Sequence, residues 1–399
     1  MVATVTVGPL VPYEALLRME LTRVGYAPLT VNETVRSMAR LSAWMLQRDL
    51  TAAGLTSPLV EQFLIVRRAR CRVEQAACVG IRTVLRTLRA ASVVPERCAI
   101  GDTPADMVLT GFRGYLVAER GLAAATVRSY TLQARKFLAQ MPEPLIETLS
   151  RLDAAMVTSF VVREAAGATN VASAKALVTA LRALLRYLHV EGFIPGSLVG
   201  AIPAVAGWRL SSLPRGLDPE QVKALLAATD VSGTRAGLRD HAVLTVLARL
   251  GLRGGEAAAL MLEDVDWRSG QILVRGKGSR VERLPMLVEV GEALSAYLLS
   301  GRPQCSCRTV FVTARPPYQG LSGACVREIM ARACRKAGLP RLGAHRLRHT
   351  LATQMLRKGA PLAEIGQVLR HRSQLATAIY AKVDYEALRM LARPWPAGA

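Results

Sequence analysis

Residues 344–356 read AHRLRHTLATQML, and the apolar side chains in this stretch recur at the spacing of an amphipathic helix. His345, Arg348 and His349 stand at positions i, i+3 and i+4, so they share one face of that helix near its N-terminal end. The free N–H groups and the dipole at such an end favour an anion. The stretch therefore predicts a cationic helix start that can bind a phosphate.

Two other roles fit the same residues. His345 and His349, four residues apart, have the spacing of two zinc ligands, but the glutamate of the HExxH pattern is absent. The two histidines also fit a capping or core role. The choice between these roles depends on what else lies in the same part of the chain.

Two further cations precede this helix. Arg253 lies in GLRGGEAAAL (251–260), between a glycine that ends one helix and a new helix with Glu256 in its first turn. A guanidinium fixed at such a junction suits bidentate contact with a phosphate. Lys277 lies at the tip of a predicted β-hairpin, GQILVRGKGSRVERLPM (270–286), and lysine, unlike arginine, can act as a general acid. A surface arginine and a solvated turn lysine are the alternative readings.

The stretch VLRHRSQLATAIYAKVDY (368–385) follows the cationic helix. A helix that begins at Pro361 ends near Leu369, His371 lies in the break after it, and Tyr380 comes nine residues later. A tyrosine hydroxyl becomes a nucleophile when cationic neighbours stabilise its phenolate. Tyr385 is the rival nucleophile, and either tyrosine alone also fits a packing role.

The pattern of the whole chain predicts a multidomain fold. Helical periodicity fills an N-terminal domain (1–100) and a second, four-helix domain (104–198), and a Pro-, Gly- and Ser-containing linker (199–216) follows. The last domain (217–399) is mixed α+β. It opens on Asp218 as N-cap and Pro219 as the first helical residue, and EAAALMLEDVDW (256–267) is expected to form one helix.

The charge of the chain points to a polyanionic partner. The 399 residues include 52 Lys and Arg against 30 Asp and Glu, which gives a formal net charge of +22. Nucleic acid is the leading candidate, while a merely basic protein or one that binds anionic membranes is the alternative. No export signal or apolar run of membrane-spanning length is visible, so a cytoplasmic protein is expected. The seven cysteines form no CxxC pair, so no metal site is expected, with Cys305-x-Cys307 the weak exception.

Taken together, the motifs resemble those of the tyrosine recombinases, the phage integrase family. GLRGGE, RGKGSR, HRLRH and LRHRSQLATAIY correspond to the family's Arg, Lys, H-x-x-R-H and L-G-H-x(8)-Y motifs. The resemblance covers residues 217–385, and residues 105–195 resemble the family's helical, SAM-like core-binding domain. Two departures stand out, because Arg370 replaces the usual glycine before the second histidine and Gly255 stands where serine is more common.

The resemblance implies a mechanism. Tyr380 attacks a DNA phosphodiester to form a 3′-phosphotyrosyl link, Arg253 and Arg348 hold the phosphate, and Lys277 protonates the leaving 5′-oxygen. His345 assists proton transfer at the nucleophile, His371 binds the phosphate, and Glu256 and His349 support the site. No metal or other cofactor is implied.

The resemblance also implies partners. Double-stranded DNA is held between the two domains that flank the linker, by a homo-tetramer on synapsed sites, alone or with related recombinases. The candidate DNA contacts are Arg128, Arg135, Lys136, Lys175 and Arg370. The long N-terminal region resembles that of the tyrosine-recombinase transposases of bacterial insertion elements. A type IB topoisomerase and a catalytically silent DNA-binding regulator are the alternative functions.

Overall fold

The computed structural model describes residues 7–70, 74–94, 103–167, 171–205, 216–229, 234–276, 280–371 and 377–380. These residues separate into two compact units. One takes residues 10–40 and the described residues from 216 onward, and the other takes 7–9 and 41–205. The division falls inside one N-terminal helix, and the boundaries expected at 100 and 198 remain predictions. Each part of the chain is described by itself.

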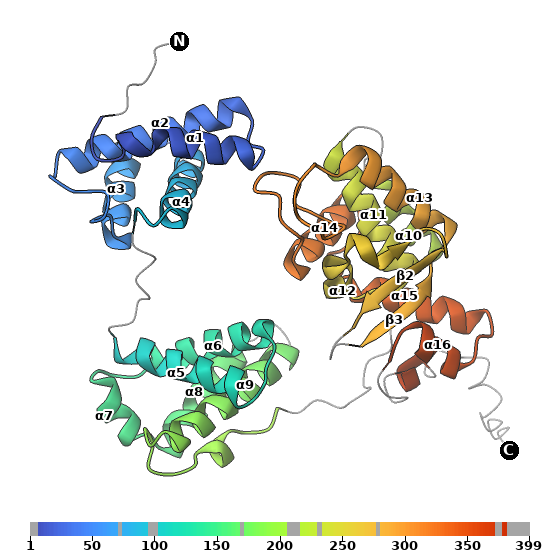
Figure 1. Cartoon of the computed structure of the whole chain (residues 1–399). Coiled ribbons are helices and arrows are strands. Elements are labelled where there is room, and N and C mark those ends of the chain that lie inside the picture. The colour runs from blue at the N-terminus through green and yellow to red at the C-terminus, as the bar shows by residue number, and fades with distance from the viewer. Residues whose placement is uncertain are drawn as a thin grey trace. The chain divides into compact units, whose positions relative to one another are not determined.

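The N-terminal region is helical, as its periodicity predicts. Apolar side chains on one face of each helix are buried, among them Leu17 and Leu21 on the first long helix and Met38 on the second. The ring of Trp44 packs edge-on against Phe63, with 5.6 Å between the ring centroids. The elements are η1 (Val11–Tyr13), α1 (Glu14–Arg23), α2 (Pro28–Leu46), α3 (Ser57–Arg70) and α4 (Glu74–Ala90) (Figure 1).

The second helical block contains four long helices and one short one. Thr103 caps its first helix by accepting a hydrogen bond from the Asp106 N–H, and Asp153 caps the fourth in the same way. The core includes Phe112, Phe137 and Phe160, all at most 1% exposed. The helices are α5 (Pro104–Ala118), α6 (Ala124–Leu138), α7 (Leu145–Ser150), α8 (Ala154–Ala166) and α9 (Val171–Val190).

The first residues of the expected linker pack on this helical block. A short 3-10 turn, η2 (Val199–Ala201), is fixed where the Thr158 hydroxyl donates to the Ala201 carbonyl. Ile202 is 3% exposed and belongs to the same core. Residues 206–215, the rest of the linker, lie outside the described residues.

The C-terminal part of the chain is mixed α+β. Its central helix, α11 (Arg235–Arg249), is buried along most of its length and packs against the helices around it. Those helices are α10 (Pro219–Ala227), α12 (Gly254–Ala259), α13 (Val288–Ala296), which continues as the π-helical turn η4 (Tyr297–Gly301), α14 (Gly323–Lys336) and α15 (His345–Arg357). Helix α16 (Leu362–Val368) packs on α15. The predicted start of α10 is confirmed, because Pro219 follows Asp218, whose N–H donates to the Gln221 side chain.

The only sheet among the described residues is antiparallel and has three strands in the order β1 (Val265–Asp266), β2 (Gln271–Arg275) and β3 (Val281–Pro285). The predicted hairpin is confirmed by the register of β2 and β3, in which Gln271 pairs with Pro285 and Arg275 with Val281. The hairpin lies next to α12 (Figure 1). Residues 277–279 at its tip, Lys277 included, lie outside the described residues.

The expectation of one helix over residues 256–267 is wrong. Helix α12 ends at Ala259, and the chain continues through the short turn η3 (Leu262–Asp264) into β1. The backbone here pairs with a distant segment, since the Val310 N–H donates to Leu260 and the Leu262 N–H to Arg308. The buried Asp264 carboxylate accepts from the Met261 N–H and from Arg275. These tertiary bonds outweigh a helical continuation.

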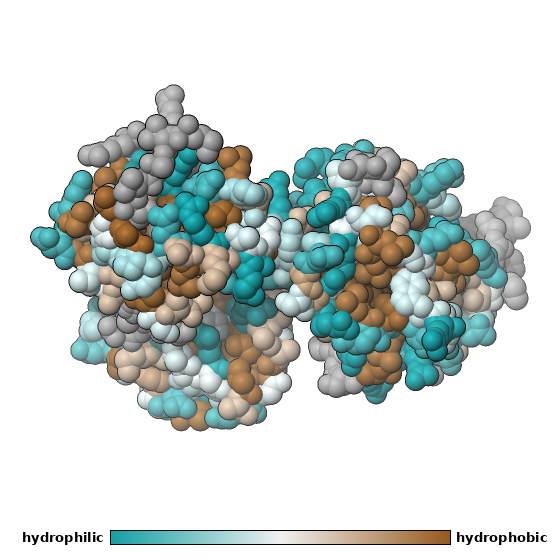
Figure 2. All heavy atoms as spheres, turned by 45° about the horizontal axis from the view of Figure 1, so that its top comes forward, coloured by the Kyte–Doolittle hydropathy of each residue, from teal (hydrophilic) through white to brown (hydrophobic). Residues whose placement is uncertain are grey.

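The visible face of the molecule mixes hydrophilic and hydrophobic residues (Figure 2). Some large apolar side chains are exposed, such as Val288 at 76% and Leu299 at 86%. Among the described residues, no helix is both long and apolar enough to cross a membrane.

Candidate active site

Arg348 is the deepest cation of the site. It lies in the first turn of α15, and its side chain is fully buried. One guanidinium nitrogen, Nη1, donates to the Gly251 carbonyl at 2.7 Å, whereas Nε and Nη2 have no hydrogen-bond partner among the described residues. Gly251 lies in the left-handed region at φ 58° after α11, so the turn places its carbonyl under the arginine. Two buried donor nitrogens of Arg348, Nε and Nη2, are thus available to a hydrogen-bond acceptor on a ligand.

Arg253 comes from the next turn of the chain, at the N-cap of α12. Its Nη1 donates to Glu256 Oε1 at 2.5 Å, and its backbone N–H donates to Glu256 Oε2 at 2.9 Å. The side chain of Arg253 remains 41% exposed, while that of Glu256 is 6% exposed. The buried carboxylate therefore orients a guanidinium whose remaining N–H groups face outward.

A second arginine binds the same carboxylate. Arg370 follows α16, and its Nη2 donates to Glu256 Oε2 at 2.9 Å across 114 residues of sequence. The side chain of Arg370 is 4% exposed, so this candidate DNA contact is enclosed in protein. Burial favours the protonated form of Glu256, but the hydrogen bonds from Arg253 and the charges of both arginines outweigh it and lower the pKa of Glu256.

Tyr380 is buried beside the histidines of α15. Its ring is 1% exposed and packs in a small cluster with Ala352, Ile365 and Leu369. Its hydroxyl lies 2.8 Å from Nδ1 of His349. The resemblance implied His345 as the partner of this hydroxyl, and the structure instead places His349 there. Burial raises the pKa of Tyr380 to about 12, although the charge of Arg348 acts in the opposite direction.

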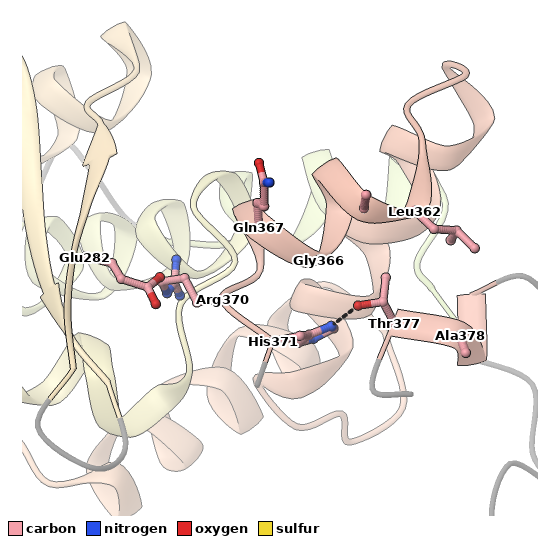
Figure 3. A pocket seen from close by; sticks show the side chains of 9 residues that line it. Glu282, Leu362, Gly366, Gln367, Arg370, His371, Thr377 and Ala378 are labelled. Atoms are coloured by element: carbon pink, nitrogen blue, oxygen red, sulfur yellow. Dashed lines mark hydrogen bonds between the residues drawn. The ribbon is translucent and has the colours of Figure 1, made fainter. Parts of the chain in front are cut away.

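The other two histidines flank this pair. The ring of His345 packs edge-on against His349, with 4.5 Å between centroids. His371 lies just after α16; its Nδ1 is 2.7 Å from the Thr377 hydroxyl, and its ring is parallel to that of Tyr380. His371, Thr377, Arg370 and Gly366 line a cavity of about 760 Å³. Figure 3 shows the bond between His371 and Thr377 in its wall.

The pKa values of all three histidines are lowered, which favours the neutral form of each ring. Burial lowers the pKa of His371 to about 4, with further lowering by the charges of Arg348 and Arg253. Burial and the neighbouring His345 lower the pKa of His349 to about 4. The pKa of His345 is lowered by burial and by Arg348. Burial and the charge of Arg253 lower the pKa of Arg348 itself to about 10, so it stays charged at neutral pH. The site is electropositive, because Glu256 is its one ion-paired carboxylate among the described residues and it faces three arginines.

The structure brings five of the six predicted catalytic residues into one region of the fold. The sixth, Lys277, falls outside the described residues. Three candidate DNA contacts, Arg128, Arg135 and Lys136, are exposed on α6, and Lys175 is exposed on the neighbouring α9. Arg135 also pairs with Asp106 at 3.7 Å.

Two functional partners were not singled out from the sequence. Gly251 supplies the carbonyl that fixes Arg348, and Thr377 holds His371. A glycine just after a helix signals a left-handed turn, but nothing local to Thr377 shows that it lies next to His371. Within the described ranges, no group of three or more His, Cys, Asp or Glu side chains is arranged to hold a metal ion.

Comparison with known proteins identifies the family of the chain. Residues 215–387 match the model of the phage integrase family, and residues 109–192 match its N-terminal SAM-like domain. The chain is 36% identical over 397 residues to the putative integrase/recombinase y4rA of Sinorhizobium fredii, covering 98% of this chain and 96% of the relative. It is 32% identical to the tyrosine recombinase XerD of Mycobacterium tuberculosis, covering 70% of this chain and 94% of the relative.

Solved structures show the same fold. The crystal structure of the XerH site-specific recombinase bound to palindromic difH, a post-cleavage complex, matches 78% of this chain and 94% of that one. The TM-score is 0.54 at 21% sequence identity. The fold, the site and the full-length relative agree, and the chain belongs to the tyrosine recombinase, or phage integrase, family and is a site-specific recombinase that acts on DNA.

Proposed function

We propose that Tyr380 is the nucleophile of the recombination reaction and that Arg348 and Arg253 bind the scissile phosphate. One observation carries the proposal: Arg348 is fully buried, two of its donor nitrogens are unpartnered among the described residues, and a buried tyrosine hydroxyl lies near enough for the charge of Arg348 to act on its pKa. Buried donors without partners destabilise a protein unless a ligand satisfies them. A phosphodiester oxygen supplies both the missing acceptor and the missing negative charge.

The two arginines have different roles in this proposal. Arg348 is held rigidly, and its Nε and Nη2 form a fork suited to two phosphate oxygens. Arg253 is half exposed but oriented by Glu256, so it closes on the phosphate from the solvent side. The negative charge on the phosphate increases in the pentacoordinate transition state, and preorganised cations stabilise that state more than the ground state.

The proton of the nucleophile passes to a histidine. In the tautomer with its proton on Nε2, His349 accepts a hydrogen bond from Tyr380 through Nδ1. As the tyrosine oxygen bonds to phosphorus, its proton moves to His349, and the bond from phosphorus to the 5′-oxygen breaks. Lys277 gives a proton to that oxygen, which leaves a 3′-phosphotyrosyl link and a free 5′-hydroxyl. His371 and His345 hydrogen-bond the phosphate oxygens from either side.

The reverse step joins new strands. A 5′-hydroxyl from a partner duplex attacks the phosphotyrosine, the tyrosine leaves, and the number of phosphodiester bonds is unchanged. The reaction therefore requires neither a metal ion nor a nucleotide, and adduct formation is expected to continue in excess chelator. We propose a homo-tetramer on synapsed DNA as the working form, in the bacterial cytoplasm where the DNA lies. Integration, excision and transposition are alternative outcomes of this chemistry.

A trapping experiment tests the proposal. A duplex selected for binding from randomised DNA is nicked beside the cleavage position, so that cleavage releases a short strand and the adduct accumulates. Covalent protein–DNA complex is measured on a denaturing gel for wild type, Tyr380→Phe and the control Tyr385→Phe. Loss of the adduct in Tyr380→Phe alone is expected. Loss of the adduct only in Tyr385→Phe would make Tyr385 the nucleophile. If the wild-type protein binds the duplex tightly but forms no adduct, it is a catalytically silent DNA-binding protein.

A further inference from the structure

Arg370 has an unusual backbone conformation for an arginine. Its φ is 55°, in the left-handed region that glycine adopts without cost, and among the described non-glycine residues only Asp49 and Ser92 also have a positive φ. The backbone N–H of Arg370 donates to the Gln367 carbonyl, and the left-handed turn lets the next N–H, that of His371, donate to the Gly366 carbonyl. A residue that accepts this strain is expected to gain something from its side chain.

The side chain of Arg370 ends on the carboxylate that orients Arg253. Its Nη2 and the backbone N–H of Arg253 share one oxygen of Glu256, each at 2.9 Å, while the Arg253 guanidinium takes the other oxygen. The side chains of Arg370 and Glu256 are both at least nine-tenths buried. An ion pair so enclosed interacts strongly, and removal of one partner leaves an uncompensated charge.

The charges around the phosphate site explain why a second arginine matters. Arg253, Arg348 and Arg370 carry three positive charges against the single negative charge of Glu256, which leaves a net charge of +2. Without Arg370, the carboxylate would cancel one of the two arginines that face the phosphate. A phosphodiester carries one negative charge, and its pentacoordinate state carries two, so the fully charged cluster matches the transition state better than the ground state.

We propose that Arg370 is a positioning residue, which neutralises Glu256 so that the charge of Arg253 is available to the phosphate and which ties the turn before His371 to α12. The proposal rests on the assignment of Arg253 and Tyr380 to the reaction. It also changes the role expected for Arg370. Direct phosphate contact by Arg370 would require its guanidinium to leave both Glu256 and its enclosure, whereas the positioning role needs no movement.

The test compares four variants of the ion pair and one control variant in single-turnover adduct formation on the nicked duplex, with DNA affinity and thermal unfolding measured in parallel. Arg370→Gly removes the ion pair while it keeps the φ of 55° free of strain. Arg370→Lys keeps the charge, Glu256→Gln removes the charge that needs neutralising, and the double variant combines Arg370→Gly with Glu256→Gln. Arg357→Ala, at an exposed position of α15, controls for the loss of one positive charge.

The expected result is a split between binding and chemistry. Arg370→Gly should slow adduct formation about 10- to 100-fold, since a displaced catalytic group costs that much. The affinity for DNA should change less than about twofold, because the residue does not touch DNA. Arg370→Lys should recover part of the rate, and Arg370→Gly should cost less in the Glu256→Gln background than in wild type.

Other outcomes overturn the proposal. If Arg370 only holds the fold, Arg370→Gly should lower the thermal stability, because it leaves Glu256 partly uncompensated, while the folded protein forms adduct at the wild-type rate. If Arg370 contacts DNA directly, Arg370→Gly should lower the affinity for DNA as well as the rate of adduct formation. The rate should then fall by the same factor whether residue 256 is Glu or Gln. If Arg370→Gly does not fold, the rates of adduct formation of Arg370→Lys and Glu256→Gln test the positioning role instead. Absence of adduct with wild-type protein would instead contradict the proposed function itself.

Discussion

The Nδ1 atom of His349 lies 2.8 Å from the hydroxyl of Tyr380, and this contact joins residues that are 31 positions apart in sequence. His349 is fixed on the second turn of α15, while Tyr380 is held by apolar packing after α16. The pair is therefore preorganised before DNA arrives. A nucleophile with a pKa near 12 needs such an acceptor, because its proton must leave as the new bond forms.

His349→Leu is expected to slow adduct formation about 100-fold or more, within the range for loss of a general base. The reason is that leucine fills the space but cannot accept the proton of Tyr380. His345→Leu is the matched comparison on the same helix face, and the smaller loss is expected there because no hydrogen bond joins His345 to Tyr380 among the described residues. Rates are measured by single-turnover trapping at saturating protein. A larger loss in His345→Leu would show that the histidines change roles on DNA.

The neutral histidines predict how stability depends on pH. His349 and His371 have pKa values of about 4 in the folded protein against 6.5 for a free histidine. Between these values the unfolded chain binds protons that the folded chain does not, so the free energy of unfolding falls as the pH decreases from about 6.5 to about 4. Above about pH 6.5 the two histidines are neutral in both states, and they add no pH dependence.

Urea unfolding at about pH 7 and about pH 5 tests this relationship. The difference between the two unfolding free energies should be smaller in His371→Gln and in His349→Gln than in wild type. Many carboxylates also titrate near the lower end of this range, so the comparison between wild type and variant is the informative quantity. Equal differences in all three proteins would mean that the histidines are solvated and titrate normally.

Local sequence patterns predicted the elements that carry the site, and they failed where distant segments meet. The β2–β3 hairpin followed from alternating residues around a glycine turn, and the start of α10 followed from Asp218 and Pro219. Helix α7 was not predicted because its six residues are too few to show a period. The bond between Arg370 and Glu256 spans 114 residues, and no local pattern encodes it. The choice of His349 over His345 at Tyr380 likewise depends on how α15 and α16 pack.

The burial of Arg348 predicts that the residue lowers the stability of the DNA-free protein and raises the rate of adduct formation. Arg348→Met removes a buried guanidinium that has one hydrogen bond and keeps the shape of an unbranched side chain. Because an undercompensated buried charge is costly, the melting temperature without DNA should be at least as high as in wild type. Adduct formation should fall about 100- to 1,000-fold, the cost of losing one transition-state donor. Calorimetry and trapping measure the two effects, and a melting temperature several degrees lower, by about the shift that 1 kcal/mol causes, would contradict the argument.

Two glycine-to-alanine substitutions, at Gly251 and at Gly255, test whether the turn at Gly251 positions Arg348. Gly251 has a φ of 58°, and a Cβ atom there would meet the side chains of Leu351 and Leu369 at 3.0 Å. Gly251→Ala should therefore destabilise the protein by about 1–2 kcal/mol, the cost of a left-handed alanine. The change should also slow adduct formation, because the Gly251 carbonyl positions Arg348.

Gly255 is the control, four residues further along the chain. It lies on the exposed side of α12, and a Cβ atom there would meet nothing within 4 Å. Gly255→Ala should stabilise the DNA-free protein by about 0.5–1 kcal/mol, because alanine loses less conformational entropy than glycine in a helix. Urea unfolding of both variants separates the two effects. Equal changes at both positions would mean that the backbone at Gly251 relaxes, and that the Arg348 guanidinium does not depend on this turn for its position.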